Sequence, residues 1–97
     1  MDRIASIVLL SLSREEIGKW TSTLIMEEQL KKNDIGFIQF KKADLAYFCE
    51  NRDKVLEFLC ELARKTKTEL ITGILYVIVQ DEMLEQSVYI DKEGEIK

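Results

Sequence analysis

The order of its apolar segments is the feature that most constrains how this chain can fold. The first segment, Ile4–Leu12, is a nearly continuous run of Ile, Val and Leu, which is typical of a β-strand covered on both faces. The longest, Leu70–Val79, is also apolar on both faces and is interrupted only by Thr72 and Gly73. Two segments with helical spacing of apolar residues lie between them. The sequence therefore predicts helices packed against a sheet.

A capping box predicts the start of the first helix. In the Ser-Arg-Glu-Glu motif at 13–16, the Ser13 hydroxyl can accept a hydrogen bond from the Glu16 amide, and the Glu16 side chain can reach back. Asn33 and Gly36 supply the signals that end this helix. The helix is therefore expected to connect the first strand to a second one.

The middle of the chain has two interpretations. Gly36–Phe40 is a short strand rich in residues that favour β-structure. Leu45–Cys49 resumes an apolar and aromatic run after a polar interruption, so the two segments could form a hairpin. A helix beginning within Ala43–Phe48 is the alternative. A further helix is expected from Asn51, which can cap it, and Gln86–Ile90 alternates like a half-exposed strand.

These elements predict one α+β domain over residues 1–97, in the order β-α-β-β-α-β with an extra C-terminal β-strand. Two helices on one face of an antiparallel sheet form a ferredoxin-like sandwich. The main alternative drops the strand at Leu45–Cys49. In the ferredoxin-like order Gly36–Phe40 is an edge strand, and unprotected edges invite pairing with another chain. Phe37 and Phe40 are therefore candidate partner-binding residues, and a homodimer is a hypothesis.

Charge is distributed unevenly along the chain. The net charge is −4, and all of it lies in residues 81–97, because residues 1–80 carry equal numbers of acids and bases. An acidic chain lacks the basic surface that nucleic-acid binding requires, so no nucleic-acid partner is expected. Asp81, Glu82 and Glu85 are instead candidate contacts for another protein with a basic surface.

The ferredoxin-like order also predicts a polarised molecule. Basic residues would gather at one end of the sheet and the acidic hairpin at the other. The basic set consists of Lys41, Lys42, Arg64, Lys65 and Lys67, and the acidic set would lie near Lys31 and Lys32.

The sequence lacks several residue types and motifs that commonly carry out catalysis or bind metals and cofactors. It has no histidine, which removes the usual general base, the Ser-His-Asp and Cys-His arrangements and the commonest transition-metal ligand. Cys49 and Cys60 are too few for a structural zinc site. We expect buried free thiols, since a disulfide would require an oxidising compartment. With no glycine-rich phosphate loop either, neither a cofactor nor a metal is expected.

The composition also bears on location. No apolar run reaches the ~18 residues that a membrane span needs, so no membrane partner is expected. Asp2-Arg3 before the first apolar run resembles a signal peptide in outline, but a buried first strand explains the run better. We therefore expect a cytoplasmic protein.

The scarcity of catalytic groups, the short chain and the acidic hairpin together favour a function without catalysis. The first hypothesis is a non-enzymatic protein-interaction module, acting as an inhibitor, an immunity-type protein or a regulatory subunit. The alternative is a dimeric small-molecule-sensing domain of ferredoxin-like fold. Its ligand would lie near Ser11 and Ser13, where free amides at the helix N-terminus could hold an anion.

Overall fold

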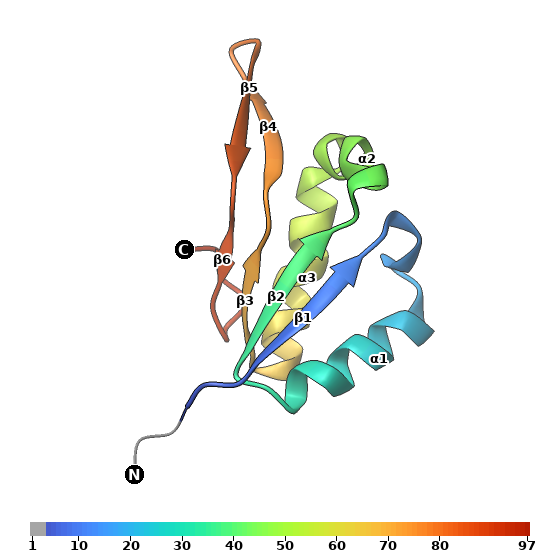
Figure 1. The fold of residues 1–97 in the computed structure, drawn as a ribbon, viewed down its shortest axis with the longest axis vertical. Coiled ribbons are helices and arrows are strands. Elements are labelled where there is room, and N and C mark those ends of the chain that lie inside the picture. Colours follow the sequence, from blue (N-terminus) through green and yellow to red (C-terminus); the bar gives the residue numbers. More distant parts are fainter. Residues whose placement is uncertain (1–3) are drawn as a thin grey trace.

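The computed structural model describes residues 4–97, so the Asp2-Arg3 segment lies outside the described chain. The elements follow in the order β1 (Ile7–Leu12), η1 (Arg14–Glu16), α1 (Trp20–Lys31), β2 (Ile35–Phe40), η2 (Lys42–Asp44), α2 (Leu45–Glu50), α3 (Arg52–Thr66), β3 (Glu69–Thr72), β4 (Leu75–Val79), β5 (Glu82–Gln86) and β6 (Tyr89–Ile90). Here η denotes a single turn of 3-10 helix. Within residues 4–97 the structure is mixed α+β, with three α-helices and two sheets (Figure 1). The predicted α+β class is confirmed.

The larger sheet has the strand order β1-β2-β3-β6 (Figure 1). Strands β1, β2 and β3 are parallel, and β6 is antiparallel to β3. Parallel neighbours need a crossover connection, which α1 provides between β1 and β2, and which α2 and α3 provide between β2 and β3. Strands β4 and β5 form a separate two-stranded hairpin.

The ferredoxin-like order is therefore not confirmed, because that arrangement requires an antiparallel sheet. The predicted strand at Leu45–Cys49 is wrong, since this segment forms α2. Its helical turn buries Phe48 completely, and the Phe48 ring lies 4.8 Å from that of Phe40. The expected edge strand is also wrong, because β2 is paired on both sides, and the edge strands of the larger sheet are β1 and β6.

The first long helix begins later than the capping box predicts. The Glu16 carboxylate accepts hydrogen bonds from the Ser13 amide at 3.0 Å and from the Ser13 hydroxyl at 2.8 Å, which stabilises the short η1. The chain then turns at Gly18, whose φ of 82° is one that glycine adopts without steric cost. As a result α1 begins only at Trp20.

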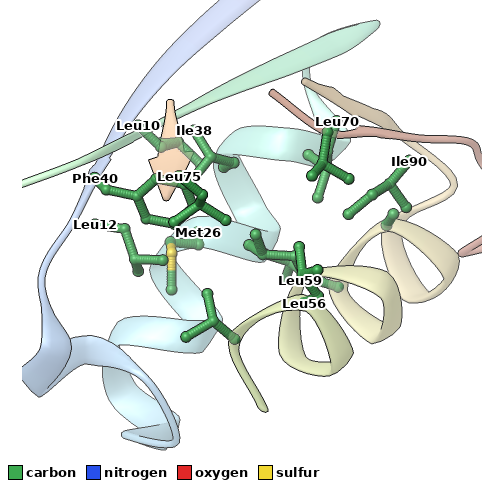
Figure 2. Packing of buried hydrophobic residues seen from close by; sticks show 14 of the residues in the cluster. Leu10, Leu12, Met26, Ile38, Phe40, Leu56, Leu59, Leu70, Leu75 and Ile90 are labelled. Atoms are coloured by element: carbon green, nitrogen blue, oxygen red, sulfur yellow. The ribbon is translucent and has the colours of Figure 1, made fainter. Parts of the chain in front are cut away.

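The core lies between one face of the larger sheet and the helices. Figure 2 shows Leu10, Ile38 and Leu70, from the three parallel strands, together with Met26 of α1 and Leu59 of α3. All five side chains are buried. Each such aliphatic side chain contributes roughly 1.5–3 kcal/mol when it leaves water. Both long helices therefore cover the same face of the sheet.

The predicted separation of charge is wrong, because it rested on the ferredoxin-like order. Helix α3 runs back from the carboxyl end of β2 to the amino end of β3, so Arg64 and Lys65 lie at the opposite end of the sheet from Lys41 and Lys42 (Figure 1). The acidic tip of the β4–β5 hairpin extends beyond the carboxyl end of β3. Basic residues thus lie at both ends.

No helix within residues 4–97 is both long enough and apolar enough to cross a membrane.

Candidate functional site

The carboxyl ends of β1, β2 and β3 lie together because these strands are parallel and in register. The Lys41 amide donates to the Leu12 carbonyl at 2.9 Å, and the Gly73 amide donates to the Ile38 carbonyl at 2.7 Å. These bonds hold the segments that follow the three strands side by side. In open α/β sheets, this end is where ligands bind.

A hollow of about 530 Å³ lies at this end, on the face of the sheet that the helices leave uncovered. We call it the sheet-end hollow, and its lining includes Leu9, Phe37, Gln39, Lys42, Leu45 and Ile74. The apolar members form its wall, while the exposed side chains of Gln39 and Lys42 supply polar groups. An apolar wall with a few polar groups is the usual make-up of a small-molecule site.

Two contacts fix the loops beside the sheet-end hollow. The Asp44 carboxylate accepts a hydrogen bond from the Arg14 amide at 3.1 Å, which joins η2 to η1. The Arg14 guanidinium lies 4.5 Å from the centre of the Tyr47 ring, where a cation–π interaction attaches the first loop to α2. Lys42 is the first residue of η2, and these two contacts attach η2 and the following α2 to the loop at Arg14.

The serines predicted as ligand-binding residues lie outside this hollow. Ser11 is exposed on β1, opposite Gln39 in the strand register, and it borders a different hollow of about 280 Å³ between β1 and α1. Ser13 directs both its amide and its hydroxyl to Glu16. The long helix does not begin there, so the expected anion site at a helix N-terminus does not form at Ser13.

The residues predicted to bind a partner are spread over different parts of the molecule. Asp81 lies in the turn of the β4–β5 hairpin, and Glu82 and Glu85 lie in β5, all exposed. Phe37 is half-buried in the wall of the sheet-end hollow. Phe40 is only 6 % exposed and belongs to the core, and like Phe37 it also lines the sheet-end hollow.

The two thiols are free and half-buried, and neither lines the sheet-end hollow. Burial is the main cause that raises the pKa of Cys60, and the Asp91 carboxylate adds to this effect, while Arg64 opposes it. Cys49 lies on α2 and lines hollows of about 500 Å³ and 350 Å³, which residues of β4 also line. Within residues 4–97, no three side chains of the types that hold metals are grouped closely enough to do so.

The sequence analysis did not identify Gln39 and Lys42 as two polar residues that line one hollow. Both stand at the end of the apolar run at 36–40, and polar residues at the carboxyl end of a parallel strand are the signal that could have found them. That signal has meaning only once the strands are known to be parallel.

The fold of this chain is similar to that of carbon–nitrogen hydrolases. A carbon–nitrogen hydrolase from Helicobacter pylori G27 matches with a TM-score of 0.70 and 19 % sequence identity, over 95 % of this chain and 37 % of that chain. An amidase from Nesterenkonia sp. matches with a TM-score of 0.62 and 14 % identity, over 96 % of this chain and 40 % of that one. An N-terminal amidase with an Asn-Glu peptide matches with a TM-score of 0.63 and 11 % identity, over 96 % and 26 %.

At these identities the likeness is one of fold, and this chain spans between about a quarter and two-fifths of the length of those proteins. No protein-family model matches the sequence. No curated protein matches it either.

These similarities correct the functional expectation from the sequence. A non-enzymatic interaction module, whether inhibitor, immunity-type protein or regulatory subunit, is the wrong class, and so is the ferredoxin-like sensing domain. The absence of histidine and of a glycine-rich phosphate loop from the sequence therefore does not argue against an enzymatic fold. The chain has a fold found in carbon–nitrogen hydrolases and amidases.

Proposed function

We propose that this chain is part of an enzyme that hydrolyses a carbon–nitrogen bond of an amide, with the substrate bound in the sheet-end hollow. The observation that carries the proposal is the position of this hollow, at the carboxyl ends of parallel strands, in a chain with the backbone of carbon–nitrogen hydrolases. The reaction adds water across the amide, breaks the carbon–nitrogen bond and releases a carboxylic acid and an amine.

The two polar side chains of the hollow are complementary to an amide group. The Lys42 ammonium carries only donors, so it can bind the carbonyl oxygen of the substrate. The Gln39 carboxamide both donates and accepts hydrogen bonds, so it can bind the nitrogen side of the substrate. We assign both residues to substrate binding.

The apolar wall sets the remainder of the substrate class. Leu9, Phe37 and Ile74 offer no hydrogen-bonding side chains, so they fit an aliphatic or aromatic group attached to the amide. Structures of the similar N-terminal amidase include Asn-Glu, Gln-Gly and Gln-Val peptides, each with a side-chain carboxamide at its first residue. We therefore propose small carboxamides with an apolar substituent as substrates.

The test is ammonia release by the natural full-length protein, together with any subunit that co-purifies, from isobutyramide, phenylacetamide and glutamine. We expect release above the buffer background, with the two apolar amides preferred. Lys42→Ala removes a charge-assisted hydrogen bond worth roughly 1.5–3 kcal/mol, so it should raise KM about ten- to a hundredfold. Gln39→Ala should raise KM by a smaller factor, because its hydrogen bonds are uncharged.

Lys32→Ala is the matched control, because Lys32 is an exposed lysine at the opposite end of the sheet, just after α1. It should leave KM unchanged. The proposal is wrong if no amide is hydrolysed, or if Lys42→Ala and Lys32→Ala have equal effects on KM.

A further inference from the structure

The larger sheet has two edges, and the structure covers only one of them. At the β6 edge the strand is two residues long, and Ile96 forms an antiparallel bridge with Ile90 on its outer side. At the other edge β1 offers the six residues Ile7–Leu12, and within residues 4–97 it pairs with β2 alone (Figure 1). An edge strand presents a row of main-chain groups to which another strand can bind.

The hydrogen bonds at the two ends of β1 show which of its main-chain groups face outward. The Ser6 carbonyl accepts from the Ile35 amide at 3.1 Å, and the Leu12 carbonyl accepts from the Lys41 amide at 2.9 Å, so both carbonyls point toward β2. The direction of the main-chain groups alternates from residue to residue along a strand. The residues whose amides and carbonyls point away from the sheet are therefore Ile7, Leu9 and Ser11.

This edge carries none of the features that usually keep an edge strand from pairing. Those features are charged side chains, proline residues and bulges. The sequence of β1 is Ile-Val-Leu-Leu-Ser-Leu, without a charge or a proline, and its register with β2 is continuous. The side chains of Ile7 and Leu9 are 65 % and 62 % exposed. The edge is thus both open and apolar.

Helix α1 leaves space beside β1. A hollow of about 280 Å³ lies between these two elements, and Ser11 of β1 lines it together with Ser22 and Ile25 of α1. Ile25 is 60 % exposed. A strand added to β1 would therefore lie beside an apolar side chain of α1.

We propose that β1 pairs antiparallel with β1 of a second copy of this chain, about a two-fold axis at Leu9. In this register Leu9 lies opposite the partner's Leu9, and Ile7 lies opposite the partner's Ser11. Residues directly opposite each other at such positions exchange both of their main-chain hydrogen bonds. Every outward amide and carbonyl of the two strands is then paired, and the two four-stranded sheets become one continuous sheet.

The symmetry of the edge favours a second copy as the partner. A two-fold dimer uses the same surface on both subunits and closes without leaving a free edge there. Leu9 is the middle one of the three outward residues, so an axis at Leu9 pairs all of them. An axis at Ile7 or at Ser11 would leave some of these groups without a partner strand.

The distribution of charge favours the same contact. The whole net charge of −4 lies in residues 81–97, which form the end of the β4–β5 hairpin, β6 and the C-terminal turn. Strand β6 is the edge opposite β1. Two copies joined at β1 therefore keep their acidic segments at the far ends of the joint sheet, where their mutual repulsion is weakest.

The first experiment tests the position of the axis by disulfide cross-linking in the natural full-length protein. In Leu9→Cys the two thiols would lie opposite each other, with their Cα atoms about 5.5 Å apart, which a disulfide can span. The matched control is Ile7→Cys, a similarly exposed position on the same face whose two copies would be roughly 13 Å apart along the strands. Under mild oxidation Leu9→Cys should form a covalent dimer at least about tenfold faster than Ile7→Cys. Equal rates would overturn the proposal.

The register is tested by combining two substitutions. Ile7→Cys together with Ser11→Cys in one chain places thiols opposite each other across the axis, so cross-linking between the two copies should be restored. Mass spectrometry of the linked peptides separates these products from any disulfide of Cys49 or Cys60. A double variant that cross-links no faster than Ile7→Cys alone would contradict the proposed register.

The second experiment measures the oligomeric state by sedimentation velocity over micromolar concentrations. We expect a dimer, and Leu9→Lys should raise its dissociation constant at least about tenfold, because two ammonium groups would lie directly opposite each other. The matched control is Leu84→Lys, which makes the same substitution at an exposed leucine of the hairpin and should leave the dissociation constant unchanged. Circular dichroism checks that Leu9→Lys is folded, as expected for a side chain that is exposed in a single copy.

Neither experiment measures hydrolysis, so the dimer and the proposed function are tested separately. A natural protein that is monomeric at every concentration would overturn the dimer. A dimer that Leu9→Lys and Leu84→Lys affect equally would also overturn it, because the contact would then lie elsewhere on the molecule.

Discussion

At the level of single residues, the packing leaves no room for a side chain at Gly36, the second residue of β2. A Cβ atom at this position would meet Cδ2 of Leu30 and lie 2.8 Å from Cδ2 of Leu70, and both leucines are fully buried. Helix α1 can therefore approach β2 only because this residue has no side chain. The sequence indicated that Gly36 helps to end a helix and begins a strand, but not that a side chain is excluded there.

Gly36→Ala should destabilise the protein by about 1–3 kcal/mol, because it overpacks a core that has no room for a methyl group. Gly73→Ala is the control, since its added Cβ would meet nothing nearer than the Ile38 carbonyl oxygen at 3.6 Å. It should change stability by no more than about 0.5 kcal/mol. Urea denaturation followed by circular dichroism measures both, and equal effects would refute this account of the packing.

The C-terminal turn depends on one carboxylate. Asp91 Oδ1 accepts hydrogen bonds from the amides of Glu95 at 3.0 Å and Glu93 at 2.9 Å, and the Lys97 ammonium lies 3.6 Å from Oδ2. The hydrogen bond from Glu95 is the largest cause that lowers the pKa of Asp91, followed by that from Glu93 and by the charge of Lys97. The Gly94 amide also donates to the Asp91 carbonyl, which closes a turn over residues 91–94.

A lowered pKa means that this turn stabilises the fold when Asp91 is ionised. The stabilisation is complete above the ordinary pKa of an aspartate and is lost as the pH falls through the lowered value. Asp91→Asn should therefore be less stable than the natural protein at neutral pH and should show a shallower loss of stability in acid. Urea midpoints measured from neutral to acidic pH test this, and identical pH profiles of the two proteins would contradict it.

At the level of elements, the helices and the hairpin differ in how directly the sequence specifies them. The helix expected from Asn51 is confirmed, with Asn51 preceding its first residue and Lys67 ending it at a φ of 54°. The predicted strand Leu70–Val79 is instead two strands, because Gly73 turns its amide to Ile38 and β4 leaves the larger sheet to pair with β5.

The turn of the β4–β5 hairpin is poorly matched to its residues. Val79 pairs with Glu82 across a two-residue loop, and the loop residues Gln80 and Asp81 have φ values of 51° and 66°. A loop with two positive φ values favours Asn-Gly, and the left-handed conformation costs a residue such as Gln80 about 1–2 kcal/mol, while Asp81 tolerates it better.

The double variant Gln80→Asn with Asp81→Gly should therefore stabilise the hairpin by about 1 kcal/mol. Hydrogen exchange of the Val77 and Leu84 amides, which lie opposite each other in the hairpin, should slow accordingly. Glu82→Gly is a control, since it places the glycine in the strand and should accelerate exchange. No change in the double variant would mean that the turn does not limit the stability of the hairpin.

At the level of the whole molecule, the uncovered face and the sheet-end hollow are two aspects of one arrangement. Three parallel strands bring their carboxyl ends together, and the helices that connect them lie on one face only. The opposite face then carries both the exposed side chains of Ile7 and Leu9 and the hollow beside Lys42. The same topology that forms the candidate site therefore also leaves it open on one side.

The candidate site could be predicted only in part. Phe37 was singled out from the sequence and lies in the wall of the hollow, but it was chosen for an edge that does not exist. Lys42 was assigned to a basic cluster with Arg64 and Lys65, which lie at the other end of the sheet. The separation of Lys42 from Arg64 and Lys65 follows from the direction in which α3 runs relative to β2. No local sequence pattern specifies that direction.

The sequence by itself determined which segments are apolar and where the second long helix begins. These features depend on neighbouring residues, through side-chain periodicity and the chemistry of helix ends and turns. Only the tertiary structure decided that Leu45–Cys49 is helical, because a short apolar run fits either state until Phe48 packs on Phe40. It also decided that β1, β2 and β3 are parallel, because alternation along a strand is the same for either direction of its neighbour. The direction of pairing comes from contacts between residues far apart in the chain, and with it come the position of the hollow and the apolar face above it.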